Sequence, residues 1–368
     1  MGAKSQLLRL ATIILLLGFF TASLTSCGYF TLKNKQLNFA RVNLPQSITL
    51  CKEPIPLESP SVWEKLDREF TIAVWDRPQV ILWLKRAGRY FPYLENKLAE
   101  EGLPDDLKYL AVAESALITG IRSSKGAVGL WQLMAPTARE YGLRKNHMID
   151  ERLHFEHATD AALNYIKHLQ NTFGNWTLVL AAYNCGEYRL KREINKQKVD
   201  DFYSLNLPSE TERFIFRITA IKIIMENPQR YGYHLEEEQI YQPLEYDTVQ
   251  VKIDQQLHLA YMAAAIGSEY RTVKELNPHI LTHQLPAGLY TLKVPQGSQS
   301  RLTAVLQQLD NKSSGEVARV SPNHYVVQAG DTLSHIAVRT GISVATLKRL
   351  NNIQGSLLRV GQRLQLTP

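Results

Sequence analysis

The most regular pattern of apolar and polar positions in the chain lies between residues 103 and 118. Apolar residues recur three and four positions apart, as they do on the buried face of an amphipathic helix. Pro104 suits the first helical position and Asp105 suits the positive end of the helix dipole, so the pattern predicts a helix from residue 104. Glu114 falls within the apolar face, whose other members are Leu107, Leu110, Ala111, Leu117 and Ile118.

A glutamate on an apolar helix face has two interpretations. An ionised carboxylate is costly to bury, so Glu114 either pairs with a cation or holds its proton above its ordinary pKa of about 4.3. A carboxyl that stays protonated near neutral pH can act as a general acid. The alternative is a glutamate at the edge of the stripe that reaches water. The helix pattern leaves both interpretations open.

A segment of small residues follows this predicted helix. Residues 123–129 read Ser-Ser-Lys-Gly-Ala-Val-Gly, and such a loop lets the backbone approach a ligand closely. Trp131 and Gln132 come next, and Pro136 then opens another helix. Sugars are bound by aromatic faces and by amide and hydroxyl groups. The stretch therefore predicts a saccharide cleft.

Further helical patterns lie on both sides. Helices are expected from Ser61 onward, and an apolar stripe over 158–173 predicts a helix that ends at Gly174. Asn175 then precedes a run over 176–183 that is apolar all round, which predicts a capped and buried helix. Tyr183 and Asn184 at the end of this helix need hydrogen-bond partners.

One more helix is expected after Pro208. Ser209 and Glu212 have the spacing of a capping box, and the apolar pattern that follows stops before Pro228. We expect this helix to close the domain that contains Glu114.

Taken together and in order, these short motifs resemble the signature of the lytic transglycosylases with a goose-type-lysozyme-like catalytic domain. The resemblance implies cleavage of the β-1,4 bond between N-acetylmuramic acid and N-acetylglucosamine in peptidoglycan, with a 1,6-anhydromuramyl product and no metal or cofactor. It implies Glu114 as the catalytic acid and then base. It implies substrate contacts from Ser115, Ser123, Gly129, Trp131, Gln132, Tyr183 and Asn184.

Two alternatives remain at this point. Asp150 and Glu151 are the nearest downstream acids and could supply a base that activates water, which would make a hydrolytic muramidase. A catalytically inactive lysozyme-like fold that only binds the wall is the second alternative. Leu117, Leu133 and Cys185 favour this second alternative, because each differs from the residue that is usual in the family at that position.

The C-terminal part contains a degenerate repeat, because Gly267 and Gly341 lie 74 positions apart within similar surroundings. The second copy predicts a strand at 325–327, two helices and a closing strand at 364–366, with Ser343 capping the second helix. This βααβ unit resembles a LysM domain, a module that binds N-acetylglucosamine chains. The resemblance implies sugar contacts from Gly330, Asp331, Thr332, Leu333 and Asn352.

The first copy differs from the second at the start of its first helix. It has Gln256-Leu257-His258 where the second copy has Gly330-Asp331-Thr332, so it has lost the glycine and the capping aspartate. We expect it to keep a LysM-like fold, and the sequence does not tell whether it binds glycan.

The N-terminus has the features of an export signal. Lys4 and Arg9 precede an apolar stretch over 10–22. A helix that spans a membrane needs about 20 apolar residues, so this stretch is too short to cross one. Cys27 follows Leu-Thr-Ser, a sequence similar to the bacterial lipobox, which implies cleavage before Cys27 and its acylation. Gly28 implies sorting to the outer membrane. The alternative is an ordinary signal peptide with a chance cysteine.

Composition narrows the classes of protein to which the chain can belong. The chain is 45% hydrophobic and 21% charged, which is typical of a globular protein. Its net charge of +7 comes without a dense basic block, which argues against nucleic-acid binding. No Cys-x-x-Cys pair occurs, the histidines are scattered, and we expect Cys51 and Cys185 to stay separate.

The sequence thus predicts an α+β multidomain protein on the periplasmic side of the outer membrane. Its expected partners are the glycan strands of peptidoglycan and membrane lipid through Cys27. The expected divisions are a lipoprotein signal peptide over residues 1–26, a membrane tether over 27–60, a mainly α lysozyme-like domain over 61–235, a degenerate LysM-like unit over 236–296, a linker over 297–322 and a LysM domain over 323–368.

Overall fold

The computed structural model describes residues 43–254, 256–314, 324–327, 331–340 and 342–366. The predicted signal peptide, the acylation site at Cys27 and the first part of the tether lie outside these residues. Within the described part of the chain, no helix combines the length and the apolar character that a membrane crossing requires.

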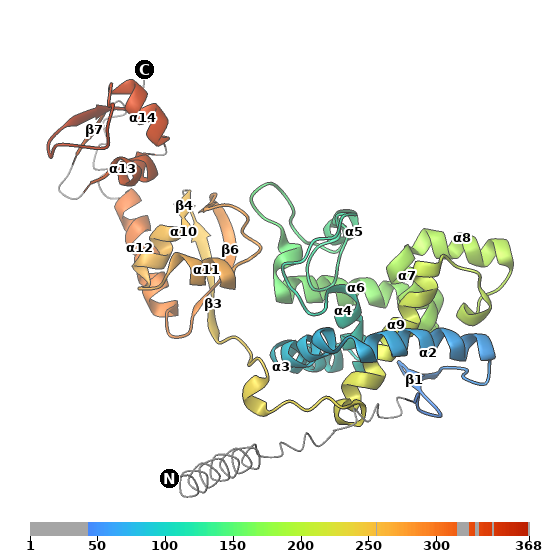
Figure 1. Cartoon of the computed structure of the whole chain (residues 1–368). Helices are drawn as coiled ribbons and strands as arrows, with labels where there is room; N and C mark the ends of the chain where they lie inside the picture. The colour runs from blue at the N-terminus through green and yellow to red at the C-terminus, as the bar shows by residue number, and fades with distance from the viewer. Residues whose placement is uncertain (1–42, 255, 315–323, 328–330, 341, 367–368) are drawn as a thin grey trace, which may run out of the picture. The chain divides into compact units, whose positions relative to one another are not determined.

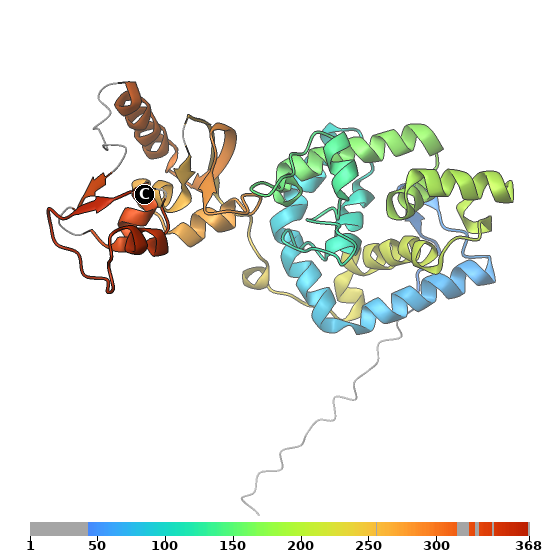
Figure 2. The same cartoon turned by 90° about the horizontal axis from the view of Figure 1, so that it is seen from above.

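Residues 49–233 form a helical domain built around one central helix, α9 (Ser209–Glu226), which is buried along most of its length. Helices α2, α4 and α7 pack against α9, as Figures 1 and 2 show. The remaining helices surround this core. The helices are α2 (Pro60–Trp75), α3 (Arg77–Glu100), α4 (Lys108–Ser115), α5 (Ala135–Glu140), α6 (Phe155–Phe173), α7 (Trp176–Cys185) and α8 (Glu187–Gln197).

The two helix boundaries predicted at Gly174 and Asn175 are confirmed. Helix α6 ends at Gly174, which adopts a φ of 71°. Asn175 caps α7, since its side-chain oxygen accepts a hydrogen bond from the backbone N–H of Leu178 at 3.1 Å. The middle of α7 is buried as expected. A glycine after one helix and an asparagine before the next set these boundaries without help from the rest of the fold.

Two local predictions are wrong. Helix α4 ends at Ser115 and does not continue to Ile118, because Ala116 and Leu117 adopt φ values of 52° and 59°. Leu117 is nevertheless buried, whereas Ile118 is exposed. The capping box before α9 is also absent: Ser209 is already helical, Pro208 occupies the cap position, and no side chain caps the helix.

The tether prediction is corrected for its last twelve residues. Strands β1 (Thr49–Leu50) and β2 (Glu53–Pro54) form an antiparallel hairpin on the helical domain. Cys51 in its turn is buried, and its backbone N–H donates to Asp106 Oδ2 at 2.6 Å. Lys222 Nζ donates to Thr49 O at 2.8 Å and to Asp106 Oδ2 at 2.7 Å. The hairpin is thus part of the domain, and Cys51 and Cys185 are both free thiols.

The first βααβ unit, residues 246–306, keeps the predicted order. Its main strands pair antiparallel from Tyr246 opposite Pro295 to Ile253 opposite Gly288. The prediction of a lost helix cap is wrong, because His258 Nδ1 accepts a hydrogen bond from the N–H of Ala260 at 3.1 Å. The elements are β3 (Tyr246–Ile253), β4 (Leu257–His258), α10 (Leu259–Ala265), α11 (Tyr270–Leu276), β5 (Gln284–Leu285) and β6 (Gly288–Pro295).

The linker predicted over 297–322 is wrong for residues 299–314. Residues Gln299–Ser314 form helix α12, and Leu302 is fully buried in the core of the first βααβ unit. That core also contains Ile149 from the helical domain. The backbone N–H of Leu281 donates to Met148 O at 2.7 Å, and that of Asp150 donates to His279 O at 2.9 Å. The first βααβ unit therefore shares its core with the helical domain.

The second βααβ unit, residues 324–366, has a small core of its own. Val327, Leu333, Ile336, Leu347 and Leu364 form it. Ser343 caps the second helix as predicted, accepting from the N–H of Thr346 at 3.1 Å. The α+β organisation is thereby confirmed. The elements are β7 (His324–Val326), α13 (Leu333–Thr340), α14 (Val344–Leu350) and β8 (Arg363–Gln365), with β7 and β8 antiparallel.

Candidate active site

Glu114 lies in the last turn of α4, and its side chain is only partly exposed. Burial raises the pKa of Glu114 to about 8, although the positive charge of Arg217 acts in the opposite direction and Glu210 adds a small increase. The carboxyl is therefore protonated at neutral pH. Both sequence interpretations hold in part, because the group reaches the surface and yet keeps its proton.

The end of α7 lies close to Glu114. The Tyr183 hydroxyl donates to the backbone oxygen of Trp131 at 2.7 Å. Burial and then the charge of Glu114 raise the pKa of Tyr183 well above its ordinary value, so the hydroxyl keeps its proton. Asn184 Oδ1 accepts from the hydroxyl of Thr211 on α9 at 3.0 Å. Both polar side chains thus have the partners that their position predicted.

Three residues predicted to contact substrate are buried instead: Ser115, Gly129 and Trp131. Trp131 is fully buried, and its indole N–H donates to Thr159 Oγ1 at 3.0 Å, so no face of the ring is open for stacking on a sugar. Ser115 is 2% exposed, and its hydroxyl donates to Ala111 O within the same helix. The prediction of direct contacts from these side chains is wrong. The Ser115 hydroxyl instead bonds the backbone of α4, the helix of Glu114, and the Trp131 indole bonds α6.

The loop over 122–133, here called the glycine loop, is held by its own residues. Gly129 has a φ of +86°, and a Cβ at this position would lie 2.0 Å from the backbone oxygen of Arg152. Gln132 Nε2 donates to Gly129 O at 2.8 Å, and Ser123 Oγ accepts from the N–H of Ala127 at 3.0 Å. Ser123 is exposed and Gln132 partly exposed, so these two predicted contacts remain available to a ligand.

A buried ion pair that the sequence did not reveal anchors the glycine loop. Arg152 donates to both carboxylate oxygens of Asp150, at 2.9 and 2.8 Å, and both side chains are almost inaccessible. The same guanidinium donates to the backbone oxygens of Gly126 and Leu133, each at 2.9 Å. One cation thus ties the middle and the end of the loop to the residues that precede α6.

Asp150 and Glu151, the two carboxylates that could have activated water, are each paired with an arginine. Burial raises the pKa of Asp150, but Arg152 and Arg122 lower it further, so the net shift is downward. For Glu151, hydrogen bonds from His157 and Arg144 outweigh burial and bring the pKa to about 2. Arg144 donates to Glu151 from its backbone N–H at 2.6 Å and from Nε at 2.9 Å. A carboxylate held in this way is a weak base.

A second ionic cluster explains the cation near Glu114. Glu69 on α2 is 4% exposed and is surrounded by arginines. Arg213 Nε donates to Glu69 Oε1 at 2.7 Å, Arg217 Nε lies 4.0 Å from Oε2, and Arg68 also pairs with this carboxylate. Arg213 and Arg217 are one helical turn apart on α9. Arg217 thus lies at the edge of the Glu69 cluster, which sequence spacing alone could not indicate.

The predicted sugar contacts of the second βααβ unit separate into two groups. Thr332 and Asn352 are exposed, and Asp331 Oδ2 accepts from the Tyr325 hydroxyl at 2.7 Å. Leu333 is 4% exposed and belongs to the core, so its predicted role as a sugar contact is wrong. Gly330 lies outside the described residues. In the part of the chain that the structure describes, no group of three or more His, Cys, Asp or Glu side chains could hold a metal ion.

Comparison with known families matches two parts of the chain. Residues 92–206, which contain Glu114, match the Transglycosylase SLT domain, and residues 325–367 match the LysM domain. The chain therefore carries an SLT domain followed by a LysM domain.

Particular proteins also resemble parts of the chain. The chain is 32% identical over 298 residues to membrane-bound lytic murein transglycosylase D of Escherichia coli K12, an alignment that covers 76% of this chain and 64% of that relative. It thus spans slightly less than two thirds of that relative's length. A segment of 41 residues is 51% identical to the autolysin of Enterococcus faecalis, covering 11% of this chain and 6% of the autolysin.

Among solved structures, lytic transglycosylase Slt of Pseudomonas aeruginosa aligns at a TM-score of 0.29 and 18% identity, covering 41% of this chain and 26% of that one. The 70 kDa soluble lytic transglycosylase of Escherichia coli aligns at a TM-score of 0.28 and 21% identity, covering 39% of this chain and 24% of that one.

Proposed function

We propose that the protein is a peptidoglycan lytic transglycosylase with Glu114 as its catalytic acid and then base. The observation that carries the proposal is a carboxyl with a pKa of about 8 inside an SLT domain. The name of the Escherichia coli relative supports murein as the substrate, and the LysM domain supports glycan binding.

In the proposed reaction, Glu114 donates its proton to the glycosidic oxygen as the bond from that oxygen to the muramyl anomeric carbon breaks. The Glu114 carboxylate then takes the proton of the muramyl 6-hydroxyl, whose oxygen bonds to the anomeric carbon and closes the 1,6-anhydro ring. Glu114 regains its proton and no water is consumed. One carboxyl therefore serves both steps, in contrast to the two that glycoside hydrolysis ordinarily uses.

The test is the chemical nature of the ends released from purified sacculi. Mass spectrometry that finds 1,6-anhydromuramyl ends supports the proposal. Free reducing ends would indicate the muramidase, and no release would indicate a wall-binding protein. The ion pairs that occupy Asp150 and Glu151 argue against the muramidase, because a base for water needs a carboxylate that is free to accept a proton.

The raised pKa of Glu114 predicts the pH profile. The acid works only when protonated, so kcat/KM on a short soluble glycan should stay level through neutral pH and fall about tenfold per pH unit above the pKa of about 8. A decline that begins near the ordinary value of 4.5 would contradict this prediction. Glu210→Gln, which removes the neighbouring negative charge, should move the decline to lower pH.

We propose further that acylated Cys27 anchors the protein in the outer membrane, on its periplasmic side. Cys27→Ala should then release the protein from membranes, because the acyl chains supply most of the anchoring free energy. Fractionation after a salt wash measures this. The control combines Cys27→Ala with deletion of 323–368, so that wall binding cannot hold the protein in the pellet. If this double variant still sediments with membranes, the lipobox interpretation is wrong.

The second βααβ unit is proposed as a separate glycan-binding module. Its core contains only its own residues, which supports independent folding. Deletion of 323–368 should weaken binding to insoluble sacculi about tenfold or more, since a linked binder raises the local concentration of polymer. Cleavage of a short soluble glycan should change less than twofold, because such a fragment cannot engage both sites. An equal loss on both substrates would place the unit in the catalytic fold.

A further inference from the structure

A segment of the helical domain, residues 144–151 and here called the docking segment, inserts into the first βααβ unit. This segment folds back on itself, since the N–H of Asn146 donates to Ile149 O at 2.8 Å and that of Glu151 donates to Arg144 O at 3.0 Å. Ile149 is 3% exposed and belongs to the core of the unit. The docking segment therefore supplies an apolar side chain to the core of a unit that lies about 100 positions further along the chain.

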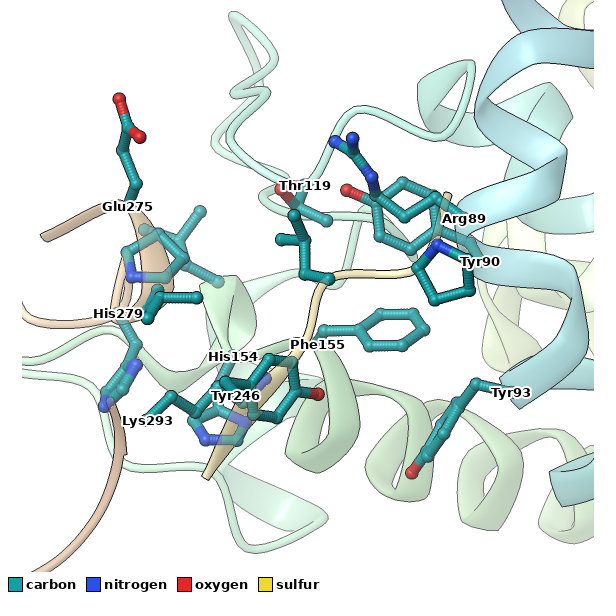
Figure 3. Close-up of a pocket in the computed structure, with 15 residues that line it drawn as sticks. Arg89, Tyr90, Tyr93, Thr119, His154, Phe155, Tyr246, Glu275, His279 and Lys293 are labelled. Atoms are coloured by element: carbon teal, nitrogen blue, oxygen red, sulfur yellow. The ribbon is translucent and has the colours of Figure 1, made fainter. Parts of the chain in front are cut away.

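The unit binds the docking segment with residues 278–284, here called the clamp loop. Ile280 is fully buried and pairs with Ile149 in an antiparallel β-bridge, and the two backbone hydrogen bonds described above flank this bridge. Figure 3 shows a pocket at the side of this junction, lined by His279 of the clamp loop and His154 of the helical domain. The centroids of these two rings are 4.7 Å apart. Backbone bonds and side-chain packing thus both join the clamp loop to the docking segment.

The equivalent loop is exposed in the second βααβ unit. Asn277 and Asn351 are equivalent, because the side-chain amide of each donates to and accepts from one backbone residue of the closing strand, β6 or β8. Counted from this asparagine, Ile280 corresponds to Gln354, and residues 354–357 are all exposed. The two copies therefore share a frame but differ in this loop, since an isoleucine buried against the docking segment stands where the second copy has an exposed glutamine.

Asp150 connects the clamp loop to the glycine loop. Its backbone N–H is bound by the clamp loop, and its carboxylate binds both Arg152 and Arg122. Arg122 is the first residue of the glycine loop, and Arg152 donates to backbone oxygens in the middle and at the end of that loop. Asp150 is therefore bound through its backbone to the first βααβ unit and through its side chain to the residues that anchor the glycine loop.

The glycine loop in turn borders the site of Glu114. Tyr183, whose pKa the charge of Glu114 raises, donates to the backbone oxygen of Trp131 in this loop. Ser123 and Gln132 are loop side chains that remain available to a ligand. A displacement of about 1 Å in groups that position a substrate can lower the rate about 100-fold. The order of this loop is therefore relevant to turnover.

We propose that the first βααβ unit is a positioning element for the active site. The clamp loop holds the docking segment, and Asp150 of that segment, together with Arg152, holds the glycine loop in place. Ile280 is thus a positioning residue that acts through the protein, and the unit contributes to turnover without binding glycan itself. The effect on turnover rests on the proposed function, whereas the effect on the order of the glycine loop does not.

The experiment is hydrogen-exchange mass spectrometry of the full chain, followed at peptides from the clamp loop, the glycine loop and α9. Ile280→Gln, which gives the clamp loop the residue of the second copy, should speed exchange about tenfold or more in both loops. Exchange in α9 should not change, because the opening is local. Ile149→Gln should act in the same way from the other side of the contact, and the double variant should add little, because both changes remove one contact. Ile280→Val should behave like the wild type. Ile55→Gln, the same change at an isoleucine of the helical domain that is 5% exposed, is the matched control.

Turnover of a short soluble glycan should fall about tenfold or more in Ile280→Gln and Ile149→Gln, and less than twofold in Ile55→Gln. Binding to insoluble sacculi should change less than twofold in all three, because the second βααβ unit supplies it. A loss of sacculus binding in Ile280→Gln as large as that caused by deletion of 323–368 would mean that the first unit binds glycan itself, which overturns the proposal.

The exchange data can contradict the proposal in three ways. Faster exchange in the clamp loop with an unchanged glycine loop overturns it, as does an unchanged clamp loop in the double variant. Equal effects of Ile55→Gln and Ile280→Gln on the glycine loop would indicate general destabilisation and also overturn it. A loosened glycine loop with normal turnover overturns the link to catalysis. If the wild type releases no anhydro ends, the proposed function fails, and the exchange measurement still decides whether the unit positions the loop.

Discussion

Glu114→Gln is expected to reduce turnover of peptidoglycan by at least about 100-fold, the lower end of what a positioned general acid contributes. The amide has the shape of the carboxyl but cannot donate a proton to the leaving oxygen, nor accept one from the 6-hydroxyl afterwards. Because one residue serves both steps, no second group in the proposed mechanism replaces it. The measurement is the rate of release of anhydro ends from purified sacculi.

The control for this prediction is the stability of the variant. The pKa of Glu114 rises on folding from 4.5 to about 8, so the folded state binds the proton more tightly and stability falls as pH rises through that window. Glutamine cannot ionise, so the variant should be at least as stable as the wild type at pH 8. Glu64→Gln, at an exposed glutamate on α2, should leave turnover unchanged. A Glu114→Gln protein that keeps a tenth or more of its activity would remove Glu114 from the acid role.

Asp150→Ala is expected to destabilise the protein by about 3–5 kcal/mol, because it leaves Arg152 as a buried charge without its partner. Both side chains are at most 2% exposed, so water cannot replace the lost carboxylate. The glycine loop should loosen with it, since the same guanidinium binds the backbone of Gly126 and Leu133. Chemical denaturation measures the change in the free energy of unfolding.

An exposed ion pair provides the comparison. Asp254 pairs with Lys252 at 2.8 Å, with side chains 45% and 72% exposed, and Asp254→Ala should cost no more than about 1 kcal/mol. The double variant Asp150→Leu with Arg152→Met should recover part of the loss, because it leaves no buried charge. If Asp150→Ala and Asp254→Ala had equal effects, the pair with Arg152 would not anchor the glycine loop.

Trp131 and Arg217, both near Glu114, illustrate where prediction from the sequence failed. Trp131 was expected to face sugar, yet it is fully buried and bonded to Thr159 on α6. A tryptophan in a core and a tryptophan in a binding cleft look alike in a sequence, since both stand among glycines and apolar residues. Only the distant partner decides between them. Sequence reasoning missed Arg217 for the same reason, because the acid it lies beside, Glu69, is 148 positions earlier in the chain.

The sequence by itself determined the features that depend on neighbouring residues. Gly174 and Asn175 end one helix and begin the next, the apolar stripe places Glu114 on a buried face, and the βααβ order of both C-terminal units follows from their turns and caps. These signals act within a few residues, so folding of the remainder does not alter them.

The tertiary structure decided everything that requires residues far apart in the chain to meet. It placed the hairpin around Cys51 on Asp106 and Lys222, and made residues 299–306 part of a core that Ile149 shares. It also made α4 stop at Ser115, where two left-handed residues turn the chain away. The physical reason is that burial and ion pairing depend on which surfaces come together, and polar segments look like linkers until a partner covers their few apolar residues.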